Sequence, residues 1–418
     1  MPGVILVKRI DPGDREASLD ELEELAVSAG YEVIDKVTQH RTPDRAYNVG
    51  RGKAEEIAIL VDEKQPEKVI FDERLSAVQI YNLSKIFQVE VIDRFNLILE
   101  IFASRARTRE ARLQVDLAGL IYEKPKARMK VTLARRGEQP GFKGLGRYQA
   151  DIYESEITGK IAKIEAELEI IRKRQGQTRI RRKEKGLDLV ALAGYTNAGK
   201  STLMNALVGE SVVAKDQLFT TLVPTTRMLE VDRRKVLLTD TVGFIRDLPH
   251  FMVEAFRSTL EEIYLADVIL LVVDASEPAK AMVEKLVTSH DTMWGEIGPV
   301  PIITVLNKCD SLSPADLDDR IEAISHLAPH PVFISAKTGE GLDILKDTIA
   351  RYLPRWVSAE VTLPRTEDGM STLSWLYDVA IVKDVEYGSC GPEPCIKARV
   401  DARETVLSQL SSMMERLA

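Results

Sequence analysis

A glycine-rich run with one lysine and one serine, Gly194–Ser201, has the residue types and spacing that best support chemistry in this chain. It reads G-x-x-x-x-G-K-S, a pattern whose backbone N–H groups, with the positive end of a following helix, can hold phosphates. Leu187–Ala193 has the apolar pattern of a buried strand, and Ser201–Leu207 that of a helix start. These flanks disfavour a chance glycine-rich turn. The residues expected to contact a nucleotide here are Asn197, Ala198, Gly199, Lys200, Ser201 and Thr202.

Four residues are expected to act on the phosphates and on a magnesium ion beside them. Lys200 should reach the β- and γ-phosphates, and the Ser201 hydroxyl should bind Mg²⁺. Asp240 follows a strand-like run and should hold the same Mg²⁺, most simply through water. The backbone N–H of Gly243 should sense the γ-phosphate. The alternative for Asp240 is a solvated carboxylate in an edge turn.

Two later segments choose between adenine and guanine. Asn307–Asp310 follows the strand-like Val300–Leu306 and resembles the N-K-x-D motif of GTPases. The Asp310 carboxylate can accept from the ring N–H and the amine of guanine, whereas adenine would leave it unpaired. Ser335–Lys337, after the strand-like Val332–Ile334, resembles the second guanine motif. The residues expected to contact the base are Asn307, Lys308, Asp310, Ser335, Ala336 and Lys337.

The segment that should switch with the nucleotide is Phe219–Thr226. We expect Thr221 to supply a hydroxyl to Mg²⁺ in the triphosphate state, with Thr220 as the alternative. Phe244 follows Gly243, where many small GTPases carry a glutamine that orients the attacking water. Because a phenyl ring cannot make that hydrogen bond, the sequence predicts slow intrinsic hydrolysis that a partner completes. Phe244 could also be a core aromatic, and the two interpretations are compatible.

Asn197 suggests a further cofactor. An asparagine at this loop position resembles that of GTPases which bind K⁺ beside the phosphates, where a cation can replace an arginine finger. Asparagine also suits a turn, so both interpretations stay open. The expected catalytic residues are Asn197, Lys200, Thr221 and Gly243, and the expected Mg²⁺ ligands are Ser201, Thr221 and Asp240.

Composition indicates a protein with several packed domains. The chain has 418 residues, 44% of them hydrophobic, and a formal net charge of −8, which does not by itself indicate a nucleic-acid-binding protein. The first residues resemble a strand rather than a signal peptide, and no apolar run suits a membrane helix. Cys309, Cys390 and Cys395 lack metal-site spacing. Cys390 and Cys395 could meet in a loop, but we interpret all three as reduced thiols. We expect a cytoplasmic monomer without a membrane anchor.

The pattern of elements predicts an α/β protein in four parts. Residues 1–104 alternate strand and helix patterns, as in a parallel sheet covered by helices. Residues 105–185 form a basic antiparallel helical hairpin with a glycine-rich loop. Residues 186–354 form a P-loop GTPase domain with a mainly parallel sheet and flanking helices, and residues 355–418 form a small α/β domain. In the first part, Gly50–Lys53 precedes a helix. It is either a second helix start that binds an anion or a glycine-rich turn.

The hairpin prediction depends on charge and periodicity. Apolar residues of its second helix recur at alternating spacings of four and three residues, which is typical of a packed seam: Ile157, Ile161, Ile164, Leu168 and Ile171. Gly137–Arg147 is too rich in glycine to pack as an element. Basic residues dominate the first helix, and Phe142 and Tyr148 could stack on bases, so the hairpin favours contact with RNA. A solvated hairpin that only joins two domains is the alternative.

The chain resembles the HflX family of translation-associated GTPases. The segments that carry the resemblance are Val49–Ile57, Val91–Glu110, Gln114–Ala118, Gly194–Ser201 and Asp240–Ile245. The resemblance implies binding to the large ribosomal subunit, with the hairpin loop directed toward ribosomal RNA, and ribosome-stimulated GTP hydrolysis. It also implies roles in splitting or rescuing stalled ribosomes under stress. The loop within Ala134–Tyr153 lacks the R-G-P-G-E-T-x-L-E-x-D run typical of bacterial members, which favours an archaeal-type member.

Two other functions are alternatives to this GTPase switch. One is an RNA-binding remodelling or chaperone protein whose N-terminal domain has its own nucleotide-dependent activity, which would require nucleotide binding at Gly50–Lys53. The other is a GTPase for RNA modification or membrane trafficking. The absence of a membrane anchor, of cysteine chemistry and of a methyl-transfer motif disfavours this last function.

Overall fold

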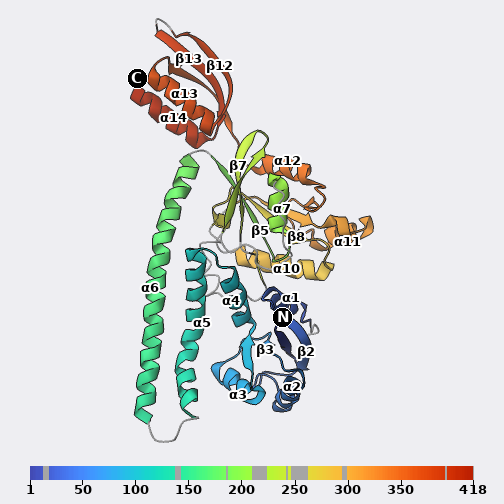
Figure 1. Ribbon diagram of the computed structural model, residues 1–418. Helices are drawn as coiled ribbons and strands as arrows, with labels where there is room; N and C mark the ends of the chain where they lie inside the picture. Colours follow the sequence, from blue (N-terminus) through green and yellow to red (C-terminus); the bar gives the residue numbers. More distant parts are fainter. Residues whose placement is uncertain are drawn as a thin grey trace. The chain divides into compact units, whose positions relative to one another are not determined.

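The computed structural model of the protein describes residues 1–12, 18–136, 143–184, 187–209, 224–241, 243–245, 262–293, 299–390 and 393–417. These residues form two compact units, which divide between Ile170 and Ile171 within one long helix. Figure 1 shows the strands of the described residues in three sheets. The predicted α/β class is confirmed, whereas the four-part division of the chain stays a prediction.

The first unit contains a four-stranded parallel sheet with the strand order β2-β1-β3-β4. Its elements are β1 (Gly3–Ile10), α1 (Asp20–Ser28), β2 (Glu32–His40), α2 (Arg51–Lys64), β3 (Lys68–Phe71), α3 (Ala77–Phe87), β4 (Glu90–Asp93) and α4 (Arg94–Arg105). Strands alternate with helices as predicted, because each parallel neighbour needs a crossover connection. The central strands β1 and β3 carry short apolar runs that are completely buried.

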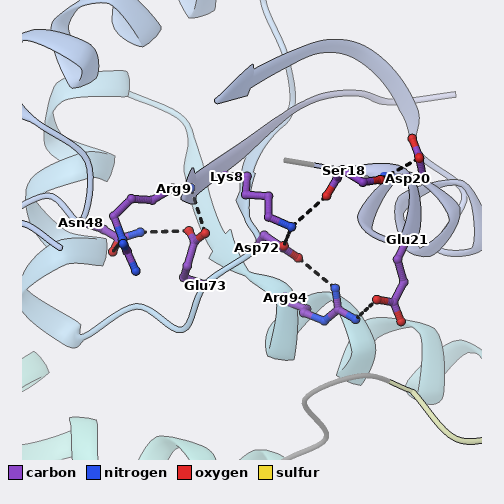
Figure 2. Close-up of polar contacts among 9 residues, drawn as sticks. All are labelled: Lys8, Arg9, Ser18, Asp20, Glu21, Asn48, Asp72, Glu73 and Arg94. Carbon is purple, nitrogen blue, oxygen red and sulfur yellow. Dashed lines mark hydrogen bonds and ion pairs between the residues drawn. The ribbon is translucent and has the colours of Figure 1, made fainter. Parts of the chain in front are cut away.

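Charged side chains gather where β1 and β3 end, as Figure 2 shows. Asp72 directly follows β3 and forms ion pairs with Lys8 at 2.9 Å and with Arg94 at 2.9 Å. Arg94 also pairs with Glu21 of α1 at 2.9 Å. The Arg94 side chain is only 6% exposed, so its charge depends on these carboxylates for compensation. The network therefore fixes α1 and α4 to the end of the sheet.

Glu73 lies beside this network, and its carboxyl group keeps its proton to an unusually high pH. Its carboxyl accepts the Arg9 backbone N–H at 2.8 Å and the Asn48 side-chain amide at 3.1 Å (Figure 2). Burial, followed by the charge of Asp72, raises the pKa of Glu73 to about 7. The folded protein therefore holds a proton on Glu73 more tightly than the unfolded chain does.

The glycine-rich segment before α2 is a helix start whose cations are already paired. Gly50 is the N-cap of α2, and its N–H donates to Gln39 at 2.8 Å. Arg51 pairs with Glu55 at 3.0 Å, and Lys53 pairs with Glu56. Carboxylates of the same helix thus neutralise both cations, as expected for a solvated turn rather than an anion site.

Two long helices form the hairpin, α5 (Arg109–Arg136) and α6 (Lys143–Glu184). Arg109 of α5 pairs with Glu167 of α6 at 2.6 Å, and Ile157 and Leu168 of the predicted seam are buried. α6 begins at Lys143, so the predicted loop through residue 147 was too long. Extending an existing helix is easier than nucleating one, which offsets the cost of two glycines there. Residues 137–142 lie outside the described part.

A buried polar cluster joins α5 to the sheet of the first unit. Asp93, at the end of β4, is completely buried and accepts from the Leu75 N–H at 3.0 Å and from the Tyr122 hydroxyl. The Lys126 ammonium lies 3.6 Å from the Asp93 carboxylate and 3.8 Å from the Tyr122 ring centroid. This carboxylate also caps α4 through the Asn96 N–H. One buried charge thus holds three elements together.

The second unit contains a six-stranded sheet with the order β10-β9-β8-β5-β7-β6, in which only the β6–β7 pair is antiparallel. Its elements are β5 (Asp188–Gly194), α7 (Lys200–Val208), β6 (Thr225–Val231), β7 (Arg234–Asp240), β8 (Val268–Asp274), α10 (Ala279–Met293), β9 (Ile302–Asn307), the 3-10 helix η1 (Cys309–Ser311), α11 (Pro314–Ile324), β10 (Val332–Phe333) and α12 (Leu342–Tyr352). The carboxyl ends of its parallel strands meet at one edge, where ligands bind in such sheets.

A three-stranded antiparallel sheet with the order β11-β13-β12 follows in the same unit. Its elements are β11 (Val357–Pro364), α13 (Glu367–Val379), β12 (Ile381–Cys390), β13 (Glu393–Ala402) and α14 (Glu404–Leu417). Arg403, just before α14, donates to Asp188 and, at 2.9 Å, to Asp267. These carboxylates stand at the start of β5 and just before β8. Arg403 therefore connects the small sheet to the edge of the six-stranded sheet that lies opposite the carboxyl ends of its parallel strands.

The cysteine prediction needs one correction. Cys395 is disulfide-bonded, whereas Cys309 is free. β12 and β13 pair as neighbouring antiparallel strands, which brings Cys395 opposite Gly388. The strand pairing that makes this possible is not evident from cysteine spacing. Within the part of the chain that the structure describes, every helix is too short or too polar to span a bilayer.

The ionisation of Glu73 predicts a pH-dependent stability of the first unit. Its folded-state pKa of about 7 lies above the ordinary value of 4.5, so this proton stabilises the fold at low pH. That stability is lost as the pH rises from 4.5 through about 7. We expect Glu73→Gln, which stays neutral, to gain stability over the native chain by on the order of 2 kcal/mol between pH 5 and pH 8.

Hydrogen exchange of the β1 and β3 amides, compared between variant and native chain at equal pH, measures this change. Glu55→Gln is the matched control, because Glu55 is an exposed partner of Arg51 on α2. A constant difference between Glu73→Gln and the native chain across this pH range would contradict the prediction.

Candidate functional site

The loop between β5 and α7 has the backbone geometry of a phosphate-binding loop. Gly194 and Gly199 have positive φ angles of 137° and 90°. A Cβ on Gly194 would lie 2.2 Å from the Val272 carbonyl oxygen, and one on Gly199 would lie 2.3 Å from the Asn307 side-chain nitrogen. Only glycine fits at either position. Gly199 is also the N-cap of α7, so the positive helix end faces the loop.

Lys200 is the first residue of α7 and is held within the loop. Its ammonium donates to the Gly194 carbonyl at 3.0 Å and to the Tyr195 carbonyl at 2.8 Å. Burial lowers the pKa of Lys200 to about 8, and the charge of Asp240 opposes part of this shift. An anion placed in the loop would favour the charged lysine, so this residue is suited to phosphate binding.

Ser201 and Asp240 come together as predicted, from α7 and from the end of β7. The Ser201 hydroxyl donates to the Asp240 carboxylate at 2.7 Å, and Asp240 is 1% exposed. A hydroxyl and a carboxylate oxygen are the ligand types that Mg²⁺ prefers, and they stand beside the phosphate loop. The donor set therefore fits Mg²⁺. Thr202 lies on the same turn of α7 and is partly buried.

The segment after β7 closes over the loop through its backbone. The Phe244 N–H donates to the Gly194 carbonyl at 3.0 Å, and the Thr196 N–H donates to the Phe244 carbonyl at 2.8 Å. A Cβ on Gly243 would lie 2.9 Å from the Lys200 ammonium and 3.0 Å from the Thr196 Cα, so a side chain there would require its neighbours to shift. Phe244 itself is 3% exposed. Both interpretations of Phe244 are compatible with this position: it is a buried aromatic, and it places no polar side chain at the phosphates.

The two base-reading segments meet the phosphate loop through Asn307. The Asn307 amide donates to the Ala198 carbonyl at 2.9 Å, and its oxygen accepts from the Ala336 N–H at 3.0 Å. Ser335 donates to the Asp310 carboxylate at 2.7 Å, which orients this exposed carboxylate for a base. Lys337 is exposed at the same loop. The predicted base residues are thus brought together around one buried amide.

One contact at the base side was not predicted. Lys308 has a left-handed backbone, with φ at 67°, and its ammonium pairs with Asp274 at 2.6 Å. Asp274 ends β8 and also accepts from the Ser276 N–H at 3.0 Å. The sequence analysis did not identify this pair, because Lys308 directly follows β9 and is 34 positions from Asp274 in the chain. Asp274 thereby directs the lysine of the N-K-x-D segment.

The remaining predicted residues are only partly placed. Asn197 has a left-handed backbone, with φ at 62°, and an exposed side chain, as both a turn residue and a cation ligand would have. Thr220 and Thr221, the two candidates for the third Mg²⁺ ligand, lie outside the described residues. Among the residues that are described, no group of three or more His, Cys, Asp or Glu side chains could hold a metal ion.

Comparison with known protein families covers most of the chain. A family profile described as "GTP-binding GTPase N-terminal" matches residues 16–103, and one described as "GTP-binding GTPase Middle Region" matches residues 105–182. A third profile, described as "50S ribosome-binding GTPase", matches residues 189–308. The last range includes the phosphate loop, Asp240 and Asn307.

Similar proteins span nearly the whole chain. GTPase HflX of Thermococcus kodakarensis is 44% identical over 394 residues, which cover 91% of this chain and 87% of that protein. GTPase HflX of Thermofilum pendens is 42% identical and covers 98% of this chain and 96% of its own length. A crystal structure titled as the complex of SsGBP with GDP aligns with 26% identity and a TM-score of 0.51, covering 84% of this chain and 98% of the other.

Proposed function

Because the chain belongs to the HflX family of GTPases, we propose that it uses GTP hydrolysis as a switch for binding the large ribosomal subunit. The protein binds guanine nucleotides and hydrolyses GTP to GDP and phosphate. The observation that carries the proposal is the site around Asn307, in which phosphate-binding and base-reading loops are joined. The proposal includes a role of the subunit-bound protein in ribosome splitting, rescue or stress-linked translation control.

The residues of the site have separate tasks in this proposal. The backbone of the loop and Lys200 bind the phosphates, while Asp310 and a backbone N–H of the Ser335–Lys337 segment select guanine. Ser201 and Asp240, with Thr221, would hold Mg²⁺, which would supply positive charge to offset that of the phosphates. Gly243 leaves space beside Lys200 for the γ-phosphate and offers its N–H. The site thus binds and orients GTP before any partner arrives.

Among the residues that the structure describes at this site, we assign none the task of orienting the attacking water. Phe244 occupies the position where a glutamine does this in many GTPases, and its backbone is paired with Gly194 and Thr196. Positioning of the nucleophile is most of what a protein contributes to phosphoryl transfer. We therefore expect slow hydrolysis by the free protein and acceleration by the partner that completes the site.

The hairpin is the proposed contact with ribosomal RNA. Its first helix is strongly basic in sequence, and the exposed face of α6 carries Lys160 and Lys163. Cations on a long, narrow element suit the phosphate backbone of an irregular RNA. The glycine-rich loop proposed for the same contact includes residues 137–142, which lie outside the described part. The proposal places the protein in the cytoplasm as a monomer.

The first prediction concerns turnover with the proposed partner. We expect GTP hydrolysis by the full chain to rise at least about tenfold on adding large ribosomal subunits from its own source, because the subunit orients the water. Lys200→Ala should abolish turnover under both conditions. Lys160→Glu with Lys163→Glu should weaken the stimulation without changing basal turnover, whereas Lys383→Glu with Lys397→Glu, on the small sheet, should not. Unchanged turnover and no co-sedimentation with a GTP analogue would exclude this partner.

A second prediction concerns the monovalent cation at Asn197. If a cation there stabilises charge that develops between the phosphates, turnover in KCl should exceed turnover in NaCl by about tenfold. Asn197→Ala should remove the difference but retain GDP binding. Equal turnover of the native chain in the two salts at the same ionic strength would reject a role for K⁺.

A further inference from the structure

The end of β8, the segment that follows it and α10 carry charged side chains which none of the nucleotide motifs explains. These side chains lie behind the phosphate loop, and a small cavity separates them from it. Tyr195, Thr196 and Ala198 line the cavity on the loop side, and Asp274, Glu277 and Lys285 line it on the other side. Asp274 directs Lys308, as described above, which leaves Glu277 and Lys285 without an assigned task.

Lys285 is held against the ring of a phosphate-loop residue. Its ammonium lies 4.8 Å from the centroid of the Tyr195 ring and 2.5 Å from the Glu277 carboxylate. Tyr195 is 6% exposed, whereas the Lys285 side chain is 32% exposed. A cation at this distance from a ring is attracted by the negative face of the π system. Glu277, which directly precedes α10, holds the Lys285 ammonium of that helix in this place through the ion pair.

Tyr195 is the point at which three parts of the site meet. Its carbonyl accepts from the Lys200 ammonium at 2.8 Å. The residues on either side of it, Gly194 and Thr196, make the two backbone hydrogen bonds to Phe244. A rotation of Tyr195 would therefore disturb both the phosphate lysine and the segment that senses the γ-phosphate.

We propose that Lys285 is a positioning residue for the GTPase reaction, which fixes the phosphate loop by holding the Tyr195 ring against α10. Lys285 acts through Tyr195 and does not itself contact the nucleotide. Without the cation, the loop would populate other conformations. Nucleotide affinity would then fall in proportion to the fraction of molecules whose loop can still bind the phosphates. Turnover of bound GTP would change little, because the loop is ordered once the phosphates are in place.

The test compares three variants of the full chain. In Lys285→Met, which removes the charge but keeps the length, we expect the KM for GTP and the Kd for GDP to rise about fivefold, with kcat within about twofold of native. Lys285→Arg should restore both constants, because a guanidinium also binds to a ring face. Lys280→Met, on the first turn of the same helix with a side chain that is 68% exposed, is the control and should behave as the native chain.

A second measurement separates positioning from general stability. Lys285→Met should have no further effect on the Kd for GDP in a Tyr195→Leu background, because the ring that transmits its effect is gone. The melting temperature without nucleotide should match that of Lys280→Met, while the rise on adding GDP should be smaller. A native Kd in Lys285→Met, failure of Lys285→Arg to restore it, or an equal effect in the Tyr195→Leu background would each overturn the proposal.

Discussion

A single side-chain amide, that of Asn307, holds the phosphate-binding and base-binding loops of this protein in one frame. It donates to the Ala198 carbonyl and accepts from the Ala336 N–H, and the residue is 2% exposed. Neither loop can move alone without leaving a buried polar group unsatisfied, which is costly. Gly199 is required for the same reason, since a side chain there would meet this amide. Recognition of the base and of the phosphates is therefore one property of the fold.

The surrounding contacts extend this frame to the switch segment and to α10. Phe244 pairs with the loop through backbone bonds, which a change in the γ-phosphate can break without unfolding a strand. Asp274 supports the base side through Lys308, and Lys285 supports the phosphate loop through Tyr195. At the opposite edge, Arg403 neutralises a buried carboxylate at the start of the strand that leads to the loop. The nucleotide site is thus fixed from several directions.

The sequence predicted what is local and missed what depends on the packing of distant elements. The phosphate loop and the Asn307–Asp310 segment were identified because strand, turn and helix signals lie next to them in the chain. The strand and helix alternation of the first unit was predicted for the same reason, and the structure confirms it. By contrast, the pairing of Lys285 with Tyr195 joins residues 90 positions apart. The disulfide of Cys395 likewise follows from strand pairing, which cysteine spacing does not reveal.

The most direct test of this account is the affinity for GDP of Asn307→Asp. The substitution keeps an oxygen for the Ala336 N–H but replaces the donor that faces the Ala198 carbonyl with a second acceptor. If this amide unites the site, the Kd for GDP should rise by at least about tenfold in a chain that stays folded by circular dichroism. A Kd within about twofold of the native value would show that the two loops hold their positions independently, and would contradict the account.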